Sequence, residues 1–198
     1  MAAILFDLYG VIMKVPSDKD LARLQGAAGA TDSRSFLEAY TRLRPDFDAG
    51  LMSPHSFWHQ MQAALGLGEM GTGELDWADL HQIDISIAMT PDQEMAARVG
   101  ELIDEGIKVG LLSNIPKDFV APARAKLPVL ERFHAVCMSA EIGLVKPDPR
   151  AFEYAAQALG EPPENIVFFD DSPINVAAAE RLGFDARLFT SISQLEPF

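Results

Sequence analysis

The chain has 198 residues, of which 48% are hydrophobic and 23% are charged, so it can bury one sizeable core and is neither disordered nor fibrous. Its net charge of -13 argues against a nucleic-acid partner, because such binding needs clustered Lys and Arg side chains. Cys137 is the only cysteine and the N-terminal apolar run is too short to span a bilayer, so we expect a cytoplasmic protein without a disulfide or a membrane anchor.

The first predicted element is a buried strand. Apolar residues fill positions 2–6 and end at Asp7, which is followed by Leu8-Tyr9-Gly10-Val11. Amphipathic helical patterns then cover residues 17–27, 33–44, 54–66 and 74–85, with no convincing strand between them. We interpret residues 15–86 as a small helical cap inserted directly after the first strand.

Strands and helices alternate after residue 90. Thr90 and Pro91 mark the start of a helix over residues 91–105. Apolar runs predict strands at 107–112, about 134–138, 165–169 and 185–189, and two cap-then-proline pairs open helices over about 149–159 and 173–182. The alternation predicts an α/β fold, a three-layer doubly wound parallel sheet whose core consists of residues 1–14 and 87–198.

Polar residues follow four of the predicted strands. A single Asp, Ser or Lys in a loop is more often a helix cap or a solvated surface group than a functional residue. In a doubly wound sheet, however, these loops converge on one edge, where ligands bind. The polar residues at this edge are Asp7, Ser113, Asn114, Lys146, Asp170 and Asp171.

With these motifs the chain resembles the haloacid dehalogenase-like (HAD) hydrolase superfamily over essentially its whole length. The matching segments are Asp7-Leu8-Tyr9-Gly10-Val11, Leu112-Ser113-Asn114, Lys146-Pro147 and Phe169-Asp170-Asp171-Ser172-Pro173-Ile174-Asn175. Within the superfamily the chain is most similar to small capped sugar-phosphate phosphatases of the glucose-1-phosphatase kind and to the N-terminal domains of soluble epoxide hydrolases. The resemblance implies a Rossmann-like core with a helical cap.

The resemblance also implies a Mg²⁺-dependent phosphatase that acts on a small phosphorylated metabolite. Asp7 would attack phosphorus and form an aspartyl-phosphate. Mg²⁺ prefers oxygen ligands, and its protein ligands would be Asp7, the backbone carbonyl of Tyr9 and Asp171, with Asp170 holding a coordinated water.

The same resemblance implies the groups that bind phosphate. Ser113 would donate its hydroxyl, Asn114 its backbone N–H, and Lys146 would supply positive charge. Asn175 would orient Lys146 or a metal-bound water, unless it only occupies the first turn of the helix that Ser172-Pro173 opens.

Tyr9 departs from the phosphatase pattern. Most phosphatases of the superfamily have a second aspartate here, which protonates the leaving group and then activates water. A phenol with a pKa near 10 can donate a proton but is rarely ionised to accept one at neutral pH. General acid–base assistance is typically worth about 10²–10⁴-fold in rate, so the resemblance predicts a slow phosphatase.

Two alternatives remain open. L-2-haloacid dehalogenases have Tyr at the position of Tyr9, and in such an enzyme Asp7 would attack carbon without a metal while Arg42 or Arg44 bound the substrate carboxylate. Asp170 and Asp171 argue against this, because two extra carboxylates without a cation would repel an anionic haloacid. The third interpretation is a non-catalytic member that binds a phosphorylated ligand or a protein partner.

Overall fold

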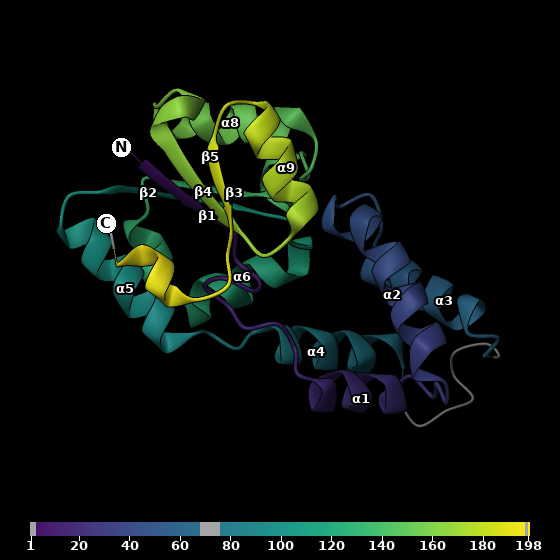
Figure 1. Cartoon of the computed structure of the whole chain (residues 1–198). Helices are drawn as coiled ribbons and strands as arrows, with labels where there is room; N and C mark the ends of the chain where they lie inside the picture. Colours follow the sequence, from purple (N-terminus) through teal and green to yellow (C-terminus); the bar gives the residue numbers. More distant parts are fainter. Residues whose placement is uncertain (1–2, 68–75, 197) are drawn as a thin grey trace.

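The computed structural model describes residues 3–67, 76–196 and 198, and within them the chain forms one parallel sheet of five strands (Figure 1). The strands are β1 (Ala3–Phe6), β2 (Lys108–Ser113), β3 (Ala135–Met138), β4 (Ile166–Asp170) and β5 (Asp185–Leu188). Their order across the sheet is β3-β2-β1-β4-β5, so the N-terminal strand lies in the middle. All pairings are parallel, as the alternation predicts.

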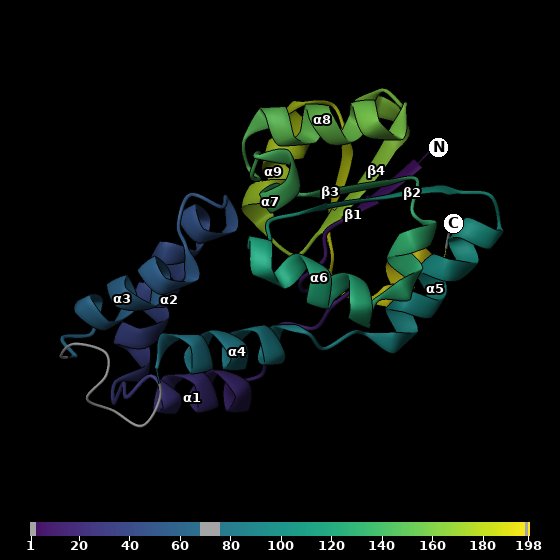
Figure 2. The ribbon, with the colours of Figure 1, turned by 180° about the vertical axis from the view of Figure 1, so that it is seen from behind.

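Helices cover both faces of the sheet, which gives the three predicted layers (Figure 2). One face is packed by α8 (Pro149–Leu159) and α9 (Pro173–Arg181), whose alanines and Phe152 contact Leu5 and Phe168. The other face is packed by α5 (Gln93–Asp104) and α6 (Lys117–Lys126), where Val99 and Phe119 are fully buried. Shorter helical segments are η1 (Pro128–Arg132), α7 (Ser139–Ile142), η2 (Pro163–Asn165) and η3 (Ile192–Leu195).

Four helices between β1 and β2 form the helical insert, a name used here for α1 (Asp18–Ala27), α2 (Ser33–Asp48), α3 (Pro54–Ala64) and α4 (Trp77–Ala88). α2 packs on α3, α3 on α4, and α4 on α1 (Figure 1). The buried side chains of the insert, Trp58 and Phe57 among them, are continuous with those on the α5 and α6 face of the sheet. The insert therefore shares one hydrophobic core with this side of the sheet, although its four helices lie beyond the sheet in Figures 1 and 2.

Most predicted elements are present with similar boundaries, but α6 lies in a stretch for which no helix was predicted, and three boundaries differ informatively. The helix predicted over 33–44 continues through Pro45 to Asp48. The helix predicted from Pro91 begins at Gln93 instead, because Asp92 and not Thr90 caps it by accepting a hydrogen bond from Met95 N. Residues 74 and 75 of the helix predicted over 74–85 lie outside the described residues, and α4 extends to Ala88.

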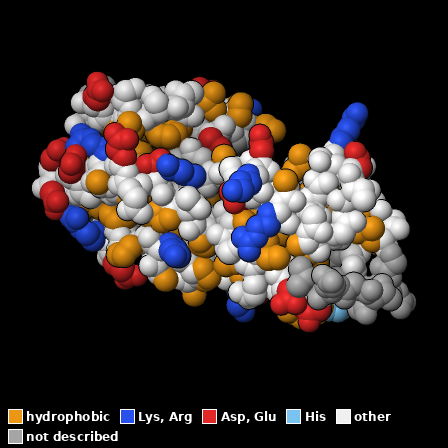
Figure 3. Space-filling model, turned by 90° about the horizontal axis from the view of Figure 1, so that it is seen from below, with side chains coloured by type: hydrophobic (Ala, Val, Ile, Leu, Met, Phe, Trp, Pro, Cys, Tyr) orange, Lys and Arg blue, Asp and Glu red, His pale blue; other side chains and the backbone are white. Residues whose placement is uncertain are grey.

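The surface carries both signs of charge. On the face shown in Figure 3, Lys and Arg side chains stand singly among acidic and hydrophobic ones rather than in one basic patch. Among the described residues, no helix is both long and apolar enough to cross a bilayer.

Candidate active site

The register of the sheet brings the predicted site residues together at one edge. Phe6 pairs with both Leu111 and Phe169, so the next position, Asp7, lies between the ends of β2 and β4. Asp7 N donates to Phe169 O at 2.9 Å, which fixes the backbone at this point. Asp7 therefore stands beside Asp170, the last residue of β4.

Lys146 bridges the two carboxylates. Its Nζ donates to Asp170 Oδ2 at 2.5 Å and lies 2.8 Å from Asp7 Oδ1. All three side chains are nearly or fully buried. Burial alone would lower the pKa of Lys146, but the fields of Asp7 and Asp170 outweigh it and raise this pKa, so the ammonium is retained.

The pKa of Asp7 is raised to about 7, because desolvation disfavours its charged form more strongly than Lys146 favours it. Asp170 adds to the rise through like-charge repulsion. A carboxylate in this state is poorly solvated, and it keeps its charge best when further positive charge is supplied.

Two asparagines hold this centre from opposite sides. Asn114 Oδ1 accepts from Lys146 N, and Asn114 Nδ2 donates to Lys146 O, both at 2.8 Å. Asn175 Nδ2 lies 3.1 Å from both oxygens of Asp170, whose Oδ1 also accepts from Ser172 N at 2.8 Å. Asn175 thus contacts Asp170 and reaches Lys146 only through it.

Ser113 and Asp171 complete the edge. Ser113 is the last residue of β2 and is buried. Its hydroxyl donates a long and therefore weak hydrogen bond to Asn114 O, at 3.5 Å, so it can turn toward a ligand. Asp171 follows β4 and is exposed. A Cβ added to Gly10 would lie 2.1 Å from Asp171 Oδ2, and Gly10 has a φ of +76°, so this turn admits only glycine without strain.

Three carboxylates at this edge could hold a metal ion. One oxygen from each of Asp7, Asp170 and Asp171 lies within 4.8 Å of the other two. An all-oxygen donor set with two or three negative charges suits a hard divalent cation such as Mg²⁺, and that charge would offset the repulsion among the carboxylates. The donor set fits a magnesium site.

Tyr9 lies within electrostatic reach of Asp7 and of a polar cluster of the helical insert. Burial raises its pKa above the ordinary phenol value; Arg44 opposes the rise, and Asp48, Asp84 and Asp7 add to it. The Tyr9 hydroxyl is buried and has no hydrogen-bond partner among the described residues. Tyr9 therefore stays protonated, and it is close both to Asp7 and to the charged side chains of the insert.

Arg44 forms the centre of that cluster. Its Nη2 lies 2.9 Å from Asp48 Oδ1, and its Nη1 lies 3.7 Å from Asp84 Oδ2 and donates to Tyr40 Oη at 3.0 Å. Tyr40 in turn donates to Asp84 Oδ1 at 2.6 Å. The guanidinium also lies 5.4 Å from the ring centroid of Phe119 in α6, so the cluster is at the contact between insert and core.

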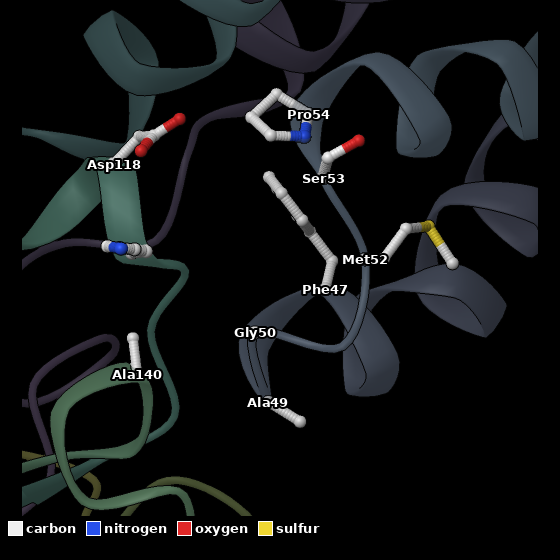
Figure 4. Close-up of a pocket in the computed structure, with 9 residues that line it drawn as sticks. Phe47, Ala49, Gly50, Met52, Ser53, Pro54, Asp118 and Ala140 are labelled. Atoms are coloured by element: carbon white, nitrogen blue, oxygen red, sulfur yellow. The ribbon is translucent and has the colours of Figure 1, made fainter.

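The insert and the core also meet at Ser139. Its hydroxyl donates to the backbone oxygen of Asp48 at 2.6 Å and accepts from Ile115 N at 2.8 Å, two residues after Ser113. Beside this contact is a cavity of about 410 Å³ (Figure 4). Phe47, Met52 and Pro54 line it from the insert, and Lys117, Asp118 and Ala140 line it from the core.

The sequence motifs located this edge, but not all of its parts. The side chain of Asn114, Ser139 and the Arg44 cluster were missed, because their roles depend on partners more than 20 residues away. The glycine in Tyr9-Gly10-Val11 was the one available signal for the close approach of Asp171.

Several characterised proteins are similar in sequence. The sesquiterpene phosphatase astK of Aspergillus oryzae is 27% identical over 137 residues, which cover 69% of this chain and 67% of that protein. The phosphoglycolate phosphatase of Salmonella paratyphi A is 33% identical over 89 residues, so the match covers 45% of this chain and only 35% of that enzyme. (S)-2-haloacid dehalogenase 1 of a Pseudomonas species is 22% identical and matches 99% of this chain and 87% of its own length.

Solved structures share the fold. A HAD family enzyme of Bacteroides thetaiotaomicron, in complex with magnesium and inorganic phosphate, superposes with a TM-score of 0.73 over 99% of both chains at 19% identity. The L-2-haloacid dehalogenase of Xanthobacter autotrophicus gives a TM-score of 0.67 at 22% identity, covering 94% of this chain and 76% of the dehalogenase. The model of the haloacid dehalogenase-like hydrolases matches residues 1–183, and the chain belongs to that family of enzymes.

Proposed function

We propose that this hydrolase is a Mg²⁺-dependent phosphatase of small phosphomonoesters that works through an aspartyl-phosphate on Asp7. The observation that carries the proposal is the group of Asp7, Asp170 and Asp171, whose carboxylate oxygens lie within 4.8 Å of one another beside a buried lysine. The helical insert, residues 15–86 in the sequence-based division, would act as the cap over this edge.

In this proposal Asp7 is the nucleophile. It is buried at the carboxyl end of the central strand, held by its backbone bond to Phe169, and its Oδ1 contacts Lys146. Attack of a carboxylate oxygen on phosphorus releases the alcohol and leaves an acyl phosphate, which water then cleaves. With a raised pKa, Asp7 depends on nearby positive charge to remain ionised at neutral pH.

The phosphoryl group would be bound by Ser113, the backbone N–H of Asn114, and Lys146. Such donors stabilise the charge that develops on the equatorial oxygens during transfer. Asn114 also fixes Lys146 through its paired 2.8 Å hydrogen bonds, and Asn175 fixes Asp170. Both asparagines therefore act on the orientation of the lysine that faces the substrate.

Asp7, Asp171 and the backbone carbonyl of Tyr9 would hold Mg²⁺, with Asp170 as a supporting acid. The ion would supply positive charge to the nucleophile edge and to the phosphate. Asp170 already binds Lys146, Ser172 N and Asn175, so it fits a supporting position better than that of a primary ligand.

Turnover is expected to be slow, because Tyr9 occupies the place of the usual acid–base group. Its buried hydroxyl has a raised pKa and cannot readily accept a proton from water.

Dehalogenation fits this site less well. The guanidinium of Arg44 is already shared by Asp48, Asp84 and Tyr40, and so is not free for a substrate carboxylate. Arg42 lines a separate hollow with Ser35 and Glu38. Asp170 and Asp171 at the end of β4 add negative charge beside Asp7. Without a metal ion, this charge would repel an anionic haloacid.

The test is hydrolysis of p-nitrophenyl phosphate by the wild type and by Asp7→Asn. We expect Mg²⁺-dependent turnover that EDTA abolishes, and loss of at least about 10³-fold in Asp7→Asn, because an amide is not a nucleophile. In the absence of Mg²⁺, Asp7→Asn should unfold at the same temperature as the wild type or at a higher one, because the substitution removes the poorly solvated negative charge of Asp7. Undiminished turnover in the variant would refute the mechanism, and chloride release from 2-chloropropionate without Mg²⁺ would favour dehalogenation.

A further inference from the structure

Ser139 is a buried polar residue that the proposed mechanism does not use. It is the first residue of α7 and is fully buried. Its hydroxyl donates to the backbone oxygen of Asp48 at 2.6 Å and accepts from Ile115 N at 2.8 Å. Within the described residues, no other hydrogen bond joins the four insert helices to the core. A single hydroxyl therefore connects the end of α2 to the loop after β2.

The Ser139 hydroxyl has a second acceptor within reach. Ile115 O lies 3.2 Å from Ser139 Oγ, whereas Asp48 O lies at 2.6 Å. A hydroxyl carries one proton, so the shorter contact to Asp48 O takes it while the insert is in contact with the core. If Asp48 O withdraws, the proton can turn to Ile115 O, and no buried donor is left without a partner. The bond to the insert can thus break and form again without disrupting the core.

The loop that Ser139 holds belongs to the proposed phosphate site. The C=O of Asn114 and the N–H of Ile115 are parts of one planar peptide group. That N–H donates to Ser139, and that C=O accepts the 3.5 Å hydrogen bond from the Ser113 hydroxyl. The Asn114 side chain is bonded to the backbone of Lys146. The bond to Ser139 therefore helps to set the positions of the Ser113 hydroxyl and of Asn114.

α7 lies on the core side of the contact between insert and core. Met138, the residue before Ser139, pairs with Ser113 in the sheet. Ala140, the residue after it, lines the core side of the cavity, across from the end of α2 (Figure 4). Ser139 thus belongs to the same sheet edge as Ser113, and it presents its hydroxyl to the insert.

From these contacts we infer that Ser139 is a positioning residue that couples the contact of the helical insert to the phosphate-binding residues Ser113 and Asn114. The inference rests on the proposed phosphatase function, and it adds to that site a residue that contacts neither substrate nor metal. A hydroxyl that donates a hydrogen bond becomes a better acceptor, because bonds in a chain polarise one another. The contact with Asp48 O therefore strengthens the bond that holds the peptide group between Asn114 and Ile115.

Ser139→Thr and Ser139→Val test the inference, because threonine and valine have nearly the same shape and only threonine has a hydroxyl. Each variant is assayed with p-nitrophenyl phosphate in Mg²⁺, and inorganic phosphate is measured as a competitive inhibitor. We expect kcat/KM of Ser139→Val to be at least about tenfold below that of Ser139→Thr, because a buried N–H loses its acceptor. For the same reason, the inhibition constant of phosphate should be at least about tenfold higher in Ser139→Val.

Phe184→Leu is the control for destabilisation alone. Phe184 is buried among the side chains on the α8 and α9 face of the sheet, so its substitution should lower stability and leave both kinetic constants of the folded enzyme unchanged. A merely structural role of Ser139 predicts the same result for Ser139→Val. Equal kinetic constants for Ser139→Thr and Ser139→Val would overturn the inference.

Hydrogen exchange of the wild type decides the matter if neither variant folds. Orthovanadate, an analogue of the phosphoryl group, is added with Mg²⁺. It should slow exchange both at the Ile115 amide and at the amides of the last turn of α2. Lack of protection at either segment would overturn the inference, whereas absence of Mg²⁺-dependent p-nitrophenyl phosphate hydrolysis by the wild type would instead refute the proposed function.

Discussion

Gly10 offers the sharpest test of the proposed metal site, because the three atoms nearest to an added methyl group all belong to Asp171. The Cβ of Gly10→Ala would lie 2.1 Å from Asp171 Oδ2, whereas ordinary contact begins near 3.4 Å, so the carboxylate must retreat by about 1.3 Å. Mg²⁺ accepts ligands near 2.0–2.1 Å in a strict octahedron, and a ligand displaced this far is lost. The φ of +76° adds a cost of about 1–2 kcal/mol for any residue other than glycine.

Gly29→Ala separates the two effects. Gly29 has nearly the same φ, +75°, but no atom lies within 4 Å of its added Cβ. Both variants should therefore lose about 1–2 kcal/mol of unfolding free energy in urea, since Asp171 is exposed and moves cheaply. Only Gly10→Ala should raise the half-activating Mg²⁺ concentration in the p-nitrophenyl phosphate assay, by at least about tenfold. The same Mg²⁺ response in both variants would refute the assignment of Asp171 as a ligand.

Two further predictions concern Lys146. Asn114→Ala removes both hydrogen bonds to the Lys146 backbone. It should lower the unfolding free energy by about 1–3 kcal/mol and should also lower kcat. A variant as stable and as active as the wild type would contradict the role of Asn114 in positioning Lys146. Lys146→Met leaves Asp7 and Asp170 without their cation and should raise the pKa of Asp7 further. A raised folded-state pKa means that stability falls as pH increases from about 4 through that pKa, so metal-free Lys146→Met should melt at a lower temperature at pH 8 than at pH 5 relative to the wild type. An unchanged difference between the two pH values would contradict this reasoning.

The sheet and its polar edge were predictable because both depend on local patterns. A run such as 165–169 is apolar, ends in an acid and is followed by a proline that opens a helix, and each of these signals is read within a few residues. Because the strands are parallel, their carboxyl ends then meet at one edge of the sheet, and no knowledge of long-range contacts is needed to predict this. Asp7, Lys146 and Asp170 meet in the structure for that reason.

Helix limits were less predictable where proline and competing caps occur. The predicted helix ends at residue 44, directly before Pro45, but the helix continues for four more residues. Proline removes one donor and strains one turn, and the buried Phe47, stacked on Phe57 at 4.6 Å, compensates through packing that no local pattern contains. Asp92 rather than Thr90 caps α5. The backbone N–H of Asp92 donates to Ile12 O, a contact with a distant part of the chain that no local pattern contains.

The continuation of α2 over residues 45–48 changes the surroundings of Tyr9, because it brings Asp48 within electrostatic reach. A helix that stopped at residue 44 would leave Asp48 in a loop, whereas the continued helix places it one turn after Arg44 and against Ser139. An aspartate in place of Tyr9 would add a third carboxylate near Asp48 and Asp84, which share a single arginine. The neutral phenol of Tyr9 adds no negative charge there. Tyr9 is therefore a neutral neighbour of the acidic side chains of the insert, which is a physical reason for a phenol rather than a carboxylate at this position.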